Sequence, residues 1–304
     1  MVSKMKRILI VYNPSSSRYI DVRKEVLDKI SSLKGYIIGK YEIKKTNIND
    51  NVSRLSKLLK NGDLVISAGG DATGVIASNA ILKSNKDVTL SVLPYGNFND
   101  LARTLGTMKL EDTFCSSTQK LYPLEIIVDN KFFRYATCYV TIGMTAEAVE
   151  LFDEPKTRKK LQQGHKSSWR SYIYLIKWYF KNRHKKQFIP DFKLNGKLQH
   201  KKTSDYAAVN GRSMCRVMKG GYDYQVPKIF RSMTGRLTNF WRLTKLMTKS
   251  ILVRTPGAET TKDVLEFLEP STIELQAEGE YQIFKNIKKL EIKKSDKYIK
   301  VIQR

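Results

Sequence analysis

Residues 63–73 read DLVISAGGDAT, an apolar run that ends in two glycines, a carboxylate, an alanine and a threonine. A continuous apolar run of this length is typical of a strand buried on both faces of a sheet. The two glycines allow the backbone to approach a phosphate closely, and the N–H groups of such a turn attract anions. The stretch therefore predicts a buried strand that ends in an anion-binding loop.

Strand and helix patterns alternate on both sides of this stretch. Strand-like runs are RILIVYN (7–13), GYIIGKYEI (35–43) and VTLSVLPYG (88–96), and helical spacing occurs over residues 22–33 and 51–60. Strands that alternate with helices build a parallel sheet with helices on its faces. We therefore predict an α/β domain with a parallel sheet over residues 1–122.

The second part of the chain has a different pattern. Short strand-like runs with hairpin breaks occupy residues 124–143 and 192–211, and one helical stretch lies near residues 169–180. Runs of this kind are typical of antiparallel sheets. We predict a mainly antiparallel β-sandwich domain over residues 123–304, with the option that its last strand returns to the first domain.

Apolar residues make up 41% of the 304 residues and charged residues 28%, which excludes wholesale disorder. The three cysteines, Cys115, Cys138 and Cys215, lie far apart, as expected of free thiols in a reducing compartment. The apolar run at residues 8–11 is too short for a signal peptide, and no uncharged stretch reaches the roughly 18 residues of a membrane span. We expect a cytoplasmic protein.

Positive charge is concentrated in the second part of the chain. Lys and Arg number 55 against 29 Asp and Glu, a formal net charge of +26. Residues 153–202 hold 15 Lys and Arg against 3 Asp and Glu, and residues 212–249 hold 9 against 1. Aromatic and basic side chains mix at residues 169–180, which suits a lipid headgroup zone. We expect the second domain to dock on the inner face of an anionic membrane. The alternative is that the basic side chains form solvated surfaces and that the aromatic side chains belong to the core.

Nucleic acid is the other polyanion that this charge could attract. The sequence shows no helix-turn-helix, zinc or aromatic RNA-binding signature. We therefore predict no nucleic-acid partner.

Three loops rich in small, polar and acidic residues follow the predicted strands, at the sheet edge where ligands bind. NPSSSR (13–18) offers hydroxyls, N–H groups and a guanidinium that could bind phosphate. Ordinary turns often have the same residue types, so a simple turn is the alternative. In GGDAT (69–73), Asp71 can hold Mg²⁺ through water. PYGNFNDLAR (94–103) adds Asp100, for which a role as helix N-cap is the alternative.

These loops, in this order and at these spacings, resemble the nucleotide loops of the diacylglycerol kinase catalytic domain family, the bacterial soluble lipid kinases related to sphingosine kinases. The family loops usually read Asn-Pro with Ser-Gly, then Gly-Gly-Asp-Gly-Thr, then Pro-x-Gly-Thr with Asn-Asp. Near the C-terminus, Glu278-Gly279-Glu280 follows TIELQ and resembles the family's Asp-Gly-Glu, whose Glu is the expected general base. The resemblance covers nearly the whole chain.

The resemblance implies a first domain of the NAD-kinase/diacylglycerol-kinase-like fold and ATP-dependent phosphorylation of a lipid hydroxyl, most often diacylglycerol to phosphatidic acid. Homodimers occur in the family. Glu280 would accept the hydroxyl proton, and Asp71, Asp100 and Glu278 would complete the catalytic set by holding Mg²⁺ through water. The residues that would line the nucleotide are Asn13, Ser15, Ser16, Arg18, Thr46, Gly69, Gly70, Thr73, Gly96, Asn97 and Arg103.

Several positions depart from the family pattern. Ser17 and Ala72 replace glycines, Val75-Ile76 replaces Asn-Glu, and Glu278 replaces Asp. A methyl group at a position with positive φ costs roughly 1 kcal/mol or more. Met233-Thr234-Gly235 lacks the carboxylate of the family's lipid-domain metal site, so we predict no second metal there.

The departures leave two alternatives open. One is a catalytically inactive relative that binds anionic membrane and nucleotide. The other is an NAD-kinase-like soluble kinase, which shares the Gly-Gly-Asp loop. The NPSSS opening and the C-terminal Glu-Gly-Glu disfavour the NAD-kinase reading.

Overall fold

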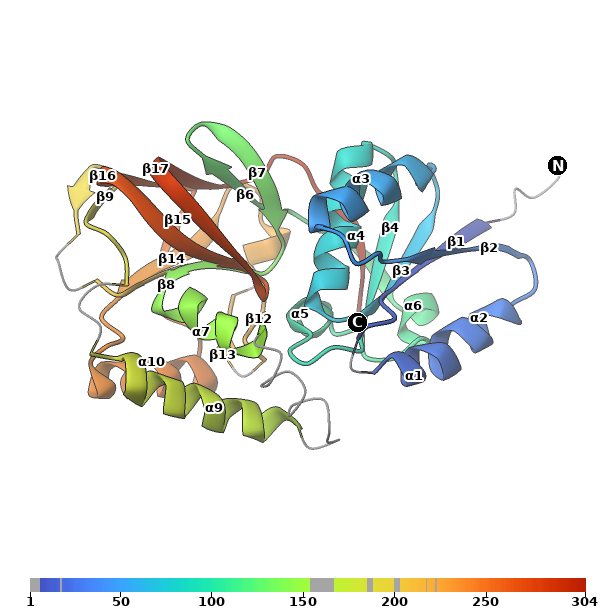
Figure 1. Cartoon of the computed structure of the whole chain (residues 1–304). Helices are drawn as coiled ribbons and strands as arrows, with labels where there is room; N and C mark the ends of the chain where they lie inside the picture. Colours follow the sequence, from blue (N-terminus) through green and yellow to red (C-terminus); the bar gives the residue numbers. More distant parts are fainter. Residues whose placement is uncertain are drawn as a thin grey trace. The chain divides into compact units, whose positions relative to one another are not determined.

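The computed structural model describes residues 6–16, 18–153, 167–184, 188–199, 203–216, 218–221 and 223–304. The chain divides into two compact units, each described by itself below (Figure 1). The first unit comprises Met1–Pro123 and Ser295–Arg304, and the second comprises Leu124–Lys294. No helix in the described ranges is long and apolar enough to cross a membrane.

The first unit contains a six-stranded sheet with the order β2-β1-β3-β4-β18-β5. Its strands are β1 (Lys6–Tyr12), β2 (Tyr36–Glu42), β3 (Leu64–Gly69), β4 (Thr89–Pro94), β5 (Ser117–Leu121) and β18 (Ile299–Gln303). Neighbouring strands are parallel, except that β5 runs antiparallel to β18. The predicted α/β domain with a parallel sheet is confirmed, and the last strand of the chain lies in its sheet.

Helices cover both faces of this sheet (Figure 1). They are α1 (Tyr19–Val22), η1 (Arg23–Asp28), α2 (Lys29–Ser31), α3 (Ile48–Leu58), α4 (Asp71–Ser84), α5 (Asp100–Leu105) and α6 (Asp112–Cys115). Alternate strand residues such as Ile8, Ile10 and Ile66 form one core with Val26 and Ile30. Helix α4 is buried at every position from 73 to 82, so an apolar Val75-Ile76 pair fits its surroundings.

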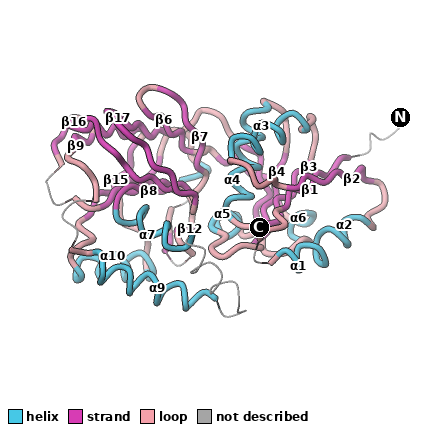
Figure 2. The backbone as a smooth tube through the Cα atoms, in the orientation of Figure 1, coloured by secondary structure: helices cyan, strands magenta, loops and turns pink. Residues whose placement is uncertain are grey.

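The second unit contains a ten-stranded antiparallel sheet with the order β15-β14-β11-β8-β16-β17-β6-β7, to which β9 and β10 add beside β16. Figure 2 shows the strands of this unit in magenta. These strands are β6 (Leu124–Val128), β7 (Lys131–Ala136), β8 (Tyr139–Gly143), β9 (Phe192–Leu194), β10 (Lys197–Leu198), β11 (Asp205–Val209), β14 (Phe230–Gly235), β15 (Ala258–Thr260), β16 (Lys262–Ala277) and β17 (Glu280–Lys294). The predicted antiparallel second domain is confirmed.

Within the described residues, the second unit also contains the short pair β12 (Ser213–Met214) and β13 (Met218–Lys219), the turn η2 (Asp223–Gln225), and the helices α7 (Met144–Asp153), α9 (Ser167–Asn182) and α10 (Phe240–Leu252). Alternate residues of the long strands, such as Leu275, Leu290 and Ile292, form the main core. A smaller core joins α9 and α10 through Tyr179, Leu237 and their neighbours.

Candidate active site

Four parallel strands of the first unit end at one edge of the sheet. Because β2, β1, β3 and β4 run in the same direction, the loops after them lie at their common carboxyl end. These loops carry the predicted residues of the first unit: Asn13, Ser15, Ser16, Arg18, Thr46, Gly69, Gly70, Asp71, Thr73, Gly96, Asn97, Asp100 and Arg103. The structure thus gathers them at the edge where open α/β sheets bind ligands.

Glycines bring the second and third loops into backbone contact. A Cβ on Gly70 would lie 3.2 Å from Gly96 Cα, and a Cβ on Gly96 would overlap Gly70 Cα. A Cβ on Gly69 would lie 2.7 Å from Thr73 Cβ. Tyr95 N–H donates to the Gly69 carbonyl at 2.9 Å. A side chain at Gly69 or Gly96 would collide with its neighbours, and one at Gly70 would be tightly crowded. Glycine backbone N–H groups at such a loop suit an approaching phosphate.

The carboxylate of Asp71 fastens the third loop. Its Oδ2 accepts from Asn99 N–H at 2.9 Å, and its Oδ1 accepts from Asp100 N–H at 2.7 Å. Asn99 is the N-cap of α5, but its side chain makes no capping bond to the helix. Instead, its Oδ1 accepts from Gly96 N–H at 2.7 Å and its Nδ2 donates to the Gly96 carbonyl at 2.7 Å. Asp71, the first residue of α4, therefore supplies the acceptor that caps the start of α5.

Asp100 is the first residue of α5 and is 1% exposed, so it is not the N-cap. The bond from its N–H to Asp71 keeps the two carboxylate-bearing residues together. Carboxylate oxygens are the ligands that Mg²⁺ prefers, and Mg²⁺ usually keeps several waters. Within the ranges that the structure describes, no group of three or more His, Cys, Asp or Glu could hold a metal by direct ligation.

The first loop begins with an Asx turn. Asn13 Oδ1 accepts from Ser15 N–H at 2.9 Å, and the Asn13 carbonyl accepts from Ser16 N–H at 3.0 Å. Ser16 Oγ is buried and has no hydrogen-bond partner among the described residues. A buried hydroxyl of this kind is ready to donate to a ligand oxygen. Ser17 lies outside the described residues.

Arg18 joins the first loop to the third. Its Nη1 donates to the Pro94 carbonyl at 3.2 Å, and its guanidinium lies 5.3 Å from the ring centroid of Tyr95. Its Nε also pairs with Asp21 at 2.7 Å, an exposed ion pair of small energetic value. Arg18 thus sits at the predicted phosphate edge, where the exposed pair with Asp21 can yield to an anion.

Two other predicted residues have supporting contacts. Arg103 Nε donates to the Phe98 carbonyl at 3.1 Å and so holds the third loop. Thr46 Oγ1 accepts from Asn51 Nδ2 at 3.1 Å. Asn51 is 1% exposed, and its Oδ1 accepts from Lys44 N–H at 2.9 Å. The sequence reasoning missed Asn51; an asparagine among the apolar positions of its helix was the available signal.

Ala72 is helical in the structure. It is the second residue of α4 and is not among the residues with positive φ. The backbone strain anticipated for a methyl group at this position therefore does not arise.

Replacing Ala72 with glycine is expected to lower the free energy of unfolding by about 0.5–1 kcal/mol, because alanine favours a helix more than glycine does. Phosphate transfer is expected not to increase. Urea unfolding of Ala72→Gly beside the unsubstituted protein measures the first effect, and an ATP-dependent transfer assay measures the second. A gain in transfer at unchanged stability would contradict the helical assignment of Ala72.

The second unit carries the predicted Glu278-Gly279-Glu280 motif at the tip of its longest hairpin. Ala277 of β16 pairs with Glu280 of β17, which leaves a two-residue turn. Glu278 has φ +54° and Gly279 has φ +85°, as a type I′ turn requires. Glycine adopts this conformation freely, whereas Glu278 is strained by roughly 1 kcal/mol.

Hydrogen bonds hold Glu278 in its strained position. Its Oε1 accepts from Thr137 Oγ1 at 2.6 Å and from Cys138 N–H, and the residue is 3% exposed. The carboxylate is therefore turned into the second unit and fixes the hairpin tip. Glu280 begins β17 and is half-buried.

Arg134 of β7 is the charged neighbour of both glutamates. It is 8% exposed, and its Nε has no hydrogen-bond partner in the part of the chain that the structure describes. Burial lowers the pKa of Arg134, while the carboxylates of Glu280 and Glu278 oppose the shift. A nearby guanidinium favours the ionised form of a carboxylate, the form that a general base needs. The sequence reasoning missed Arg134, although an arginine inside the apolar strand KFFRYA was a visible signal.

A buried polar chain extends from the Glu278 anchor. Asn210 Nδ2 donates to the Thr137 carbonyl at 2.7 Å, and Lys294 Nζ donates to Asn210 Oδ1 and, at 2.6 Å, to the Asp223 carbonyl. Burial lowers the pKa of Lys294 to about 7, with Asp223 opposing the shift. The interior behind the hairpin tip thus contains a titratable amine.

Lys294 is expected to make the free energy of unfolding rise with pH between about 7 and 10.5, because its amine binds a proton in the unfolded chain but not in the folded one in this window. This contribution is complete above pH 10.5 and is lost as the pH falls to about 7. The slope reaches up to about 1.4 kcal/mol per pH unit. Urea unfolding across this range should show the slope in the protein and in the exposed control Lys288→Met, but not in Lys294→Met. An equal slope in Lys294→Met would contradict the assignment.

Comparison with protein families matches residues 7–126 to the diacylglycerol kinase catalytic domain. A diacylglycerol kinase of Bacillus subtilis (strain 168) is 33% identical over 131 residues, which are 40% of this chain and 41% of that protein. A diacylglycerol kinase of Staphylococcus aureus (strain JH9) is 33% identical over 103 residues, 33% of this chain and 32% of that protein. The matched segments therefore span less than half of these relatives.

Comparison of folds extends over the whole chain. A crystal structure of a diacylglycerol kinase from Bacillus anthracis str. Sterne aligns with a TM-score of 0.66 at 12% identity, over 99% of this chain and 98% of that chain. Another Bacillus anthracis structure aligns with a TM-score of 0.71 at 14% identity over the same shares. At such identities the likeness shows the fold alone. Residues 7–126 of this chain match the model of the diacylglycerol kinase catalytic domain, which confirms the resemblance carried by the loop motifs.

Proposed function

We propose that this protein is a lipid kinase that transfers the terminal phosphate of ATP to the hydroxyl of a membrane lipid, with diacylglycerol as substrate and phosphatidic acid as product. The observation that carries the proposal is the backbone contact between Gly70 of the second loop and Gly96 of the third. Asp71 lies beside this contact and fastens the third loop to the second through its carboxylate. Phosphoryl transfer depends mainly on positioning and on neutralising charge. The names of the relatives support the same reaction class.

The residues at the sheet edge fit a nucleotide with Mg²⁺. Ser16 has a buried hydroxyl with no partner among the described residues, and Gly70 and Gly96 bring the second and third loops into backbone contact at this edge. Asp71 and Asp100 would hold Mg²⁺ through water. Glu278, predicted from the sequence as a third carboxylate of this set, has its Oε1 engaged by Thr137 and Cys138 inside the second unit, so we leave it out of the proposed Mg²⁺ set. Bound Mg²⁺ supplies neutralisation of the phosphate charge.

Glu280 is the proposed general base. It is half-buried beside Arg134, which favours its ionised form, and a carboxylate can accept the proton of a lipid hydroxyl within hydrogen-bond reach. Arg134 would act through Glu280 as a positioning residue.

The basic second domain is the proposed membrane-docking part, at the inner face of an anionic membrane. Lys185 and Lys186, candidates for this contact, lie outside the described residues. A homodimer and the absence of a nucleic-acid partner remain predictions.

Transfer of radiolabelled phosphate from ATP with Mg²⁺ to a lipid extract in anionic micelles tests the proposal. We expect a labelled product that migrates with phosphatidic acid. Label on another lipid would replace diacylglycerol as the substrate, and label on NAD in a parallel assay with added NAD would identify the soluble-kinase alternative. Vesicle binding without any labelled product would favour the inactive relative.

A further inference from the structure

The second unit contains a pocket of about 550 Å³ where the end of β14 meets the start of α10. Its wall includes Met233, Thr234, Arg236, Arg242 and Leu246. Strands β11 and β8 separate β14 from β16, which carries the hairpin tip with Glu280. At about 4.8 Å per strand, the two strands lie roughly 14 Å apart within the sheet. The pocket is therefore distinct from the proposed catalytic base.

Arg236 and Arg242, two arginines of the pocket wall, make no ion pair with another described residue. Among the described residues, neither the Arg236 nor the Arg242 guanidinium makes an ion pair or a hydrogen bond, and no Asp or Glu lines the pocket. Arg231, earlier on β14, behaves differently, since it pairs with Asp223 at 3.2 Å and Glu259 at 2.6 Å. Asp223 and Glu259 are thus engaged by Arg231, and a site with two guanidinium groups suits a phosphate group.

Threonine and apolar side chains complete the pocket. Thr203 and Thr234 offer hydroxyls, whereas Met233, Leu237 and Leu246 offer apolar surface. A ligand that matches this lining carries an anionic phosphate next to a hydrocarbon portion. An anionic phospholipid has this chemistry.

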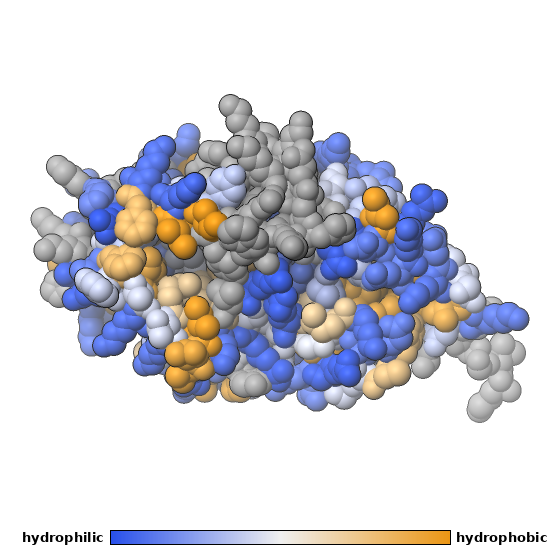
Figure 3. Space-filling model, turned by 90° about the horizontal axis from the view of Figure 1, so that it is seen from below, coloured by the Kyte–Doolittle hydropathy of each residue, from blue (hydrophilic) through white to orange (hydrophobic). Residues whose placement is uncertain are grey.

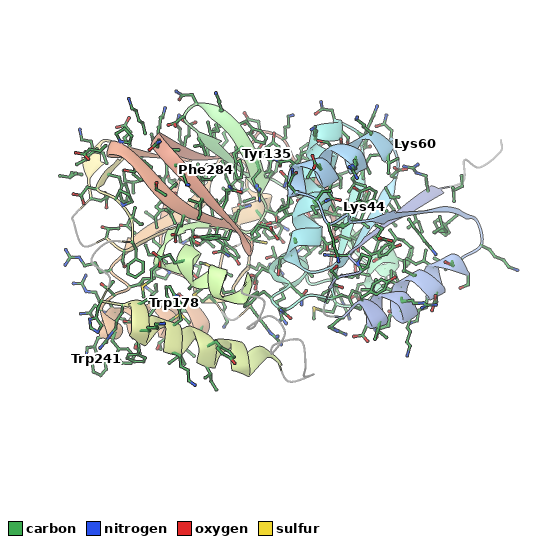
Figure 4. All side chains as sticks on the ribbon, viewed as in Figure 1. Lys44, Lys60, Tyr135, Trp178, Trp241 and Phe284 are labelled. Atoms are coloured by element: carbon green, nitrogen blue, oxygen red, sulfur yellow. The ribbon has the colours of Figure 1, made fainter. Side chains whose placement is uncertain are left out.

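Exposed aromatic side chains lie beside the pocket on the first turn of α10. Trp241 is 77% exposed and stands at the outer edge of the second unit, and Phe240 is 39% exposed (Figure 4). The Phe240 ring lies 5.6 Å from the Phe180 ring of α9, so the two helices share one surface. Ile176 of α9 is 55% exposed on the same helix pair. Tryptophan beside basic residues is typical of a membrane-water interface.

Figure 3 views the molecule from the side that carries α9 and α10 and shows hydrophobic patches among hydrophilic side chains. We propose that the pocket at Arg236 and Arg242 binds the phosphate headgroup of an anionic phospholipid, and that Trp241 enters the headgroup region beside it. This site would be part of the proposed membrane contact. It rests on the proposed function only in taking the membrane as the place where the protein acts.

Binding of the full chain to vesicles tests the site. The probes are vesicles of phosphatidylcholine alone and of phosphatidylcholine with phosphatidylglycerol, in a sedimentation assay. The double variant Arg236→Gln/Arg242→Gln is expected to bind the anionic vesicles about 30-fold more weakly, the loss expected of two basic groups at an anionic surface. The matched control Lys285→Gln/Lys288→Gln removes the same charge from exposed positions of β17 and is expected to bind as the unsubstituted protein does. Equal loss in both variants would show diffuse attraction and overturn the site.

Two further readouts separate lipid from free phosphate. In a Trp169→Phe/Trp178→Phe background, which leaves Trp241 as the single tryptophan of the sequence, anionic vesicles are expected to shift the fluorescence to the blue, and an unchanged emission maximum would overturn the insertion of Trp241. Inorganic phosphate at millimolar concentration is expected not to displace the protein from vesicles; full displacement would assign the pocket to free phosphate. Circular dichroism and thermal unfolding check that each variant is folded.

The same double variant distinguishes failure of this site from failure of the proposed kinase. In neutral detergent micelles it is expected to transfer phosphate as the unsubstituted protein does. If the unsubstituted protein transfers no phosphate at all, the vesicle comparison still decides whether the pocket binds lipid.

Discussion

Glu280→Gln is expected to reduce phosphate transfer to lipid by about 10²–10⁴-fold, the usual contribution of a general base. Glutamine keeps the size of the side chain but cannot accept the hydroxyl proton as a carboxylate does. ATP affinity is expected to stay unchanged, because the nucleotide loops belong to the first unit. The measurement is the initial rate of labelled-lipid formation at saturating ATP, with nucleotide affinity measured by titration calorimetry.

The matched control is Glu266→Gln, which makes the same chemical change at an exposed position of β16. This control is expected to retain full activity. The variant Arg134→Met adds a second readout, since loss of the guanidinium should raise the apparent pKa of the activity profile if Arg134 favours ionised Glu280. Unchanged turnover in Glu280→Gln would remove Glu280 from the base position.

Gly96→Ala is expected to lower transfer by about 10²-fold, the effect of displacing a reacting group by about 1 Å. The added Cβ would overlap Gly70 Cα and lie 3.0 Å from Asn99 Oδ1, so the second and third loops must separate. That separation also disturbs the bonds between Asp71 and the start of α5. ATP affinity is expected to fall together with the rate, in contrast to Glu280→Gln.

Gly74→Ala serves as the control for this change. Its Cβ would lie 3.4 Å from Leu101 Cδ2, an ordinary contact, and alanine favours the helix α4 in which Gly74 lies. Activity is therefore expected to persist in Gly74→Ala. Normal ATP affinity and turnover in Gly96→Ala would show that the contact of the two loops is not needed for nucleotide binding.

Local sequence predicted the strands and loops of the first unit well. The apolar runs that end in GGDAT and PYGNFND became β3 and β4, and their loops meet as parallel strands require. The residues that support these loops were harder to find. Asn51 bonds to Lys44 and Thr46 in the loop just before its helix, whereas Arg134 lies near Glu278 and Glu280 from a distant part of the chain. A polar residue within an apolar run marks both positions in the sequence, but only the folded chain shows their partners.

The sequence by itself determined the alternation of strands and helices, the glycines of the loops and the acidic residues at the strand ends, because these follow from local periodicity and chain geometry. Only the tertiary structure decided what those residues touch. It made Asp71 the cap of another helix, placed Ala72 in a helix and turned Glu278 inward against Thr137. The physical reason is that hydrogen bonds and burial depend on which distant segments meet, whereas propensity acts over a few neighbouring residues.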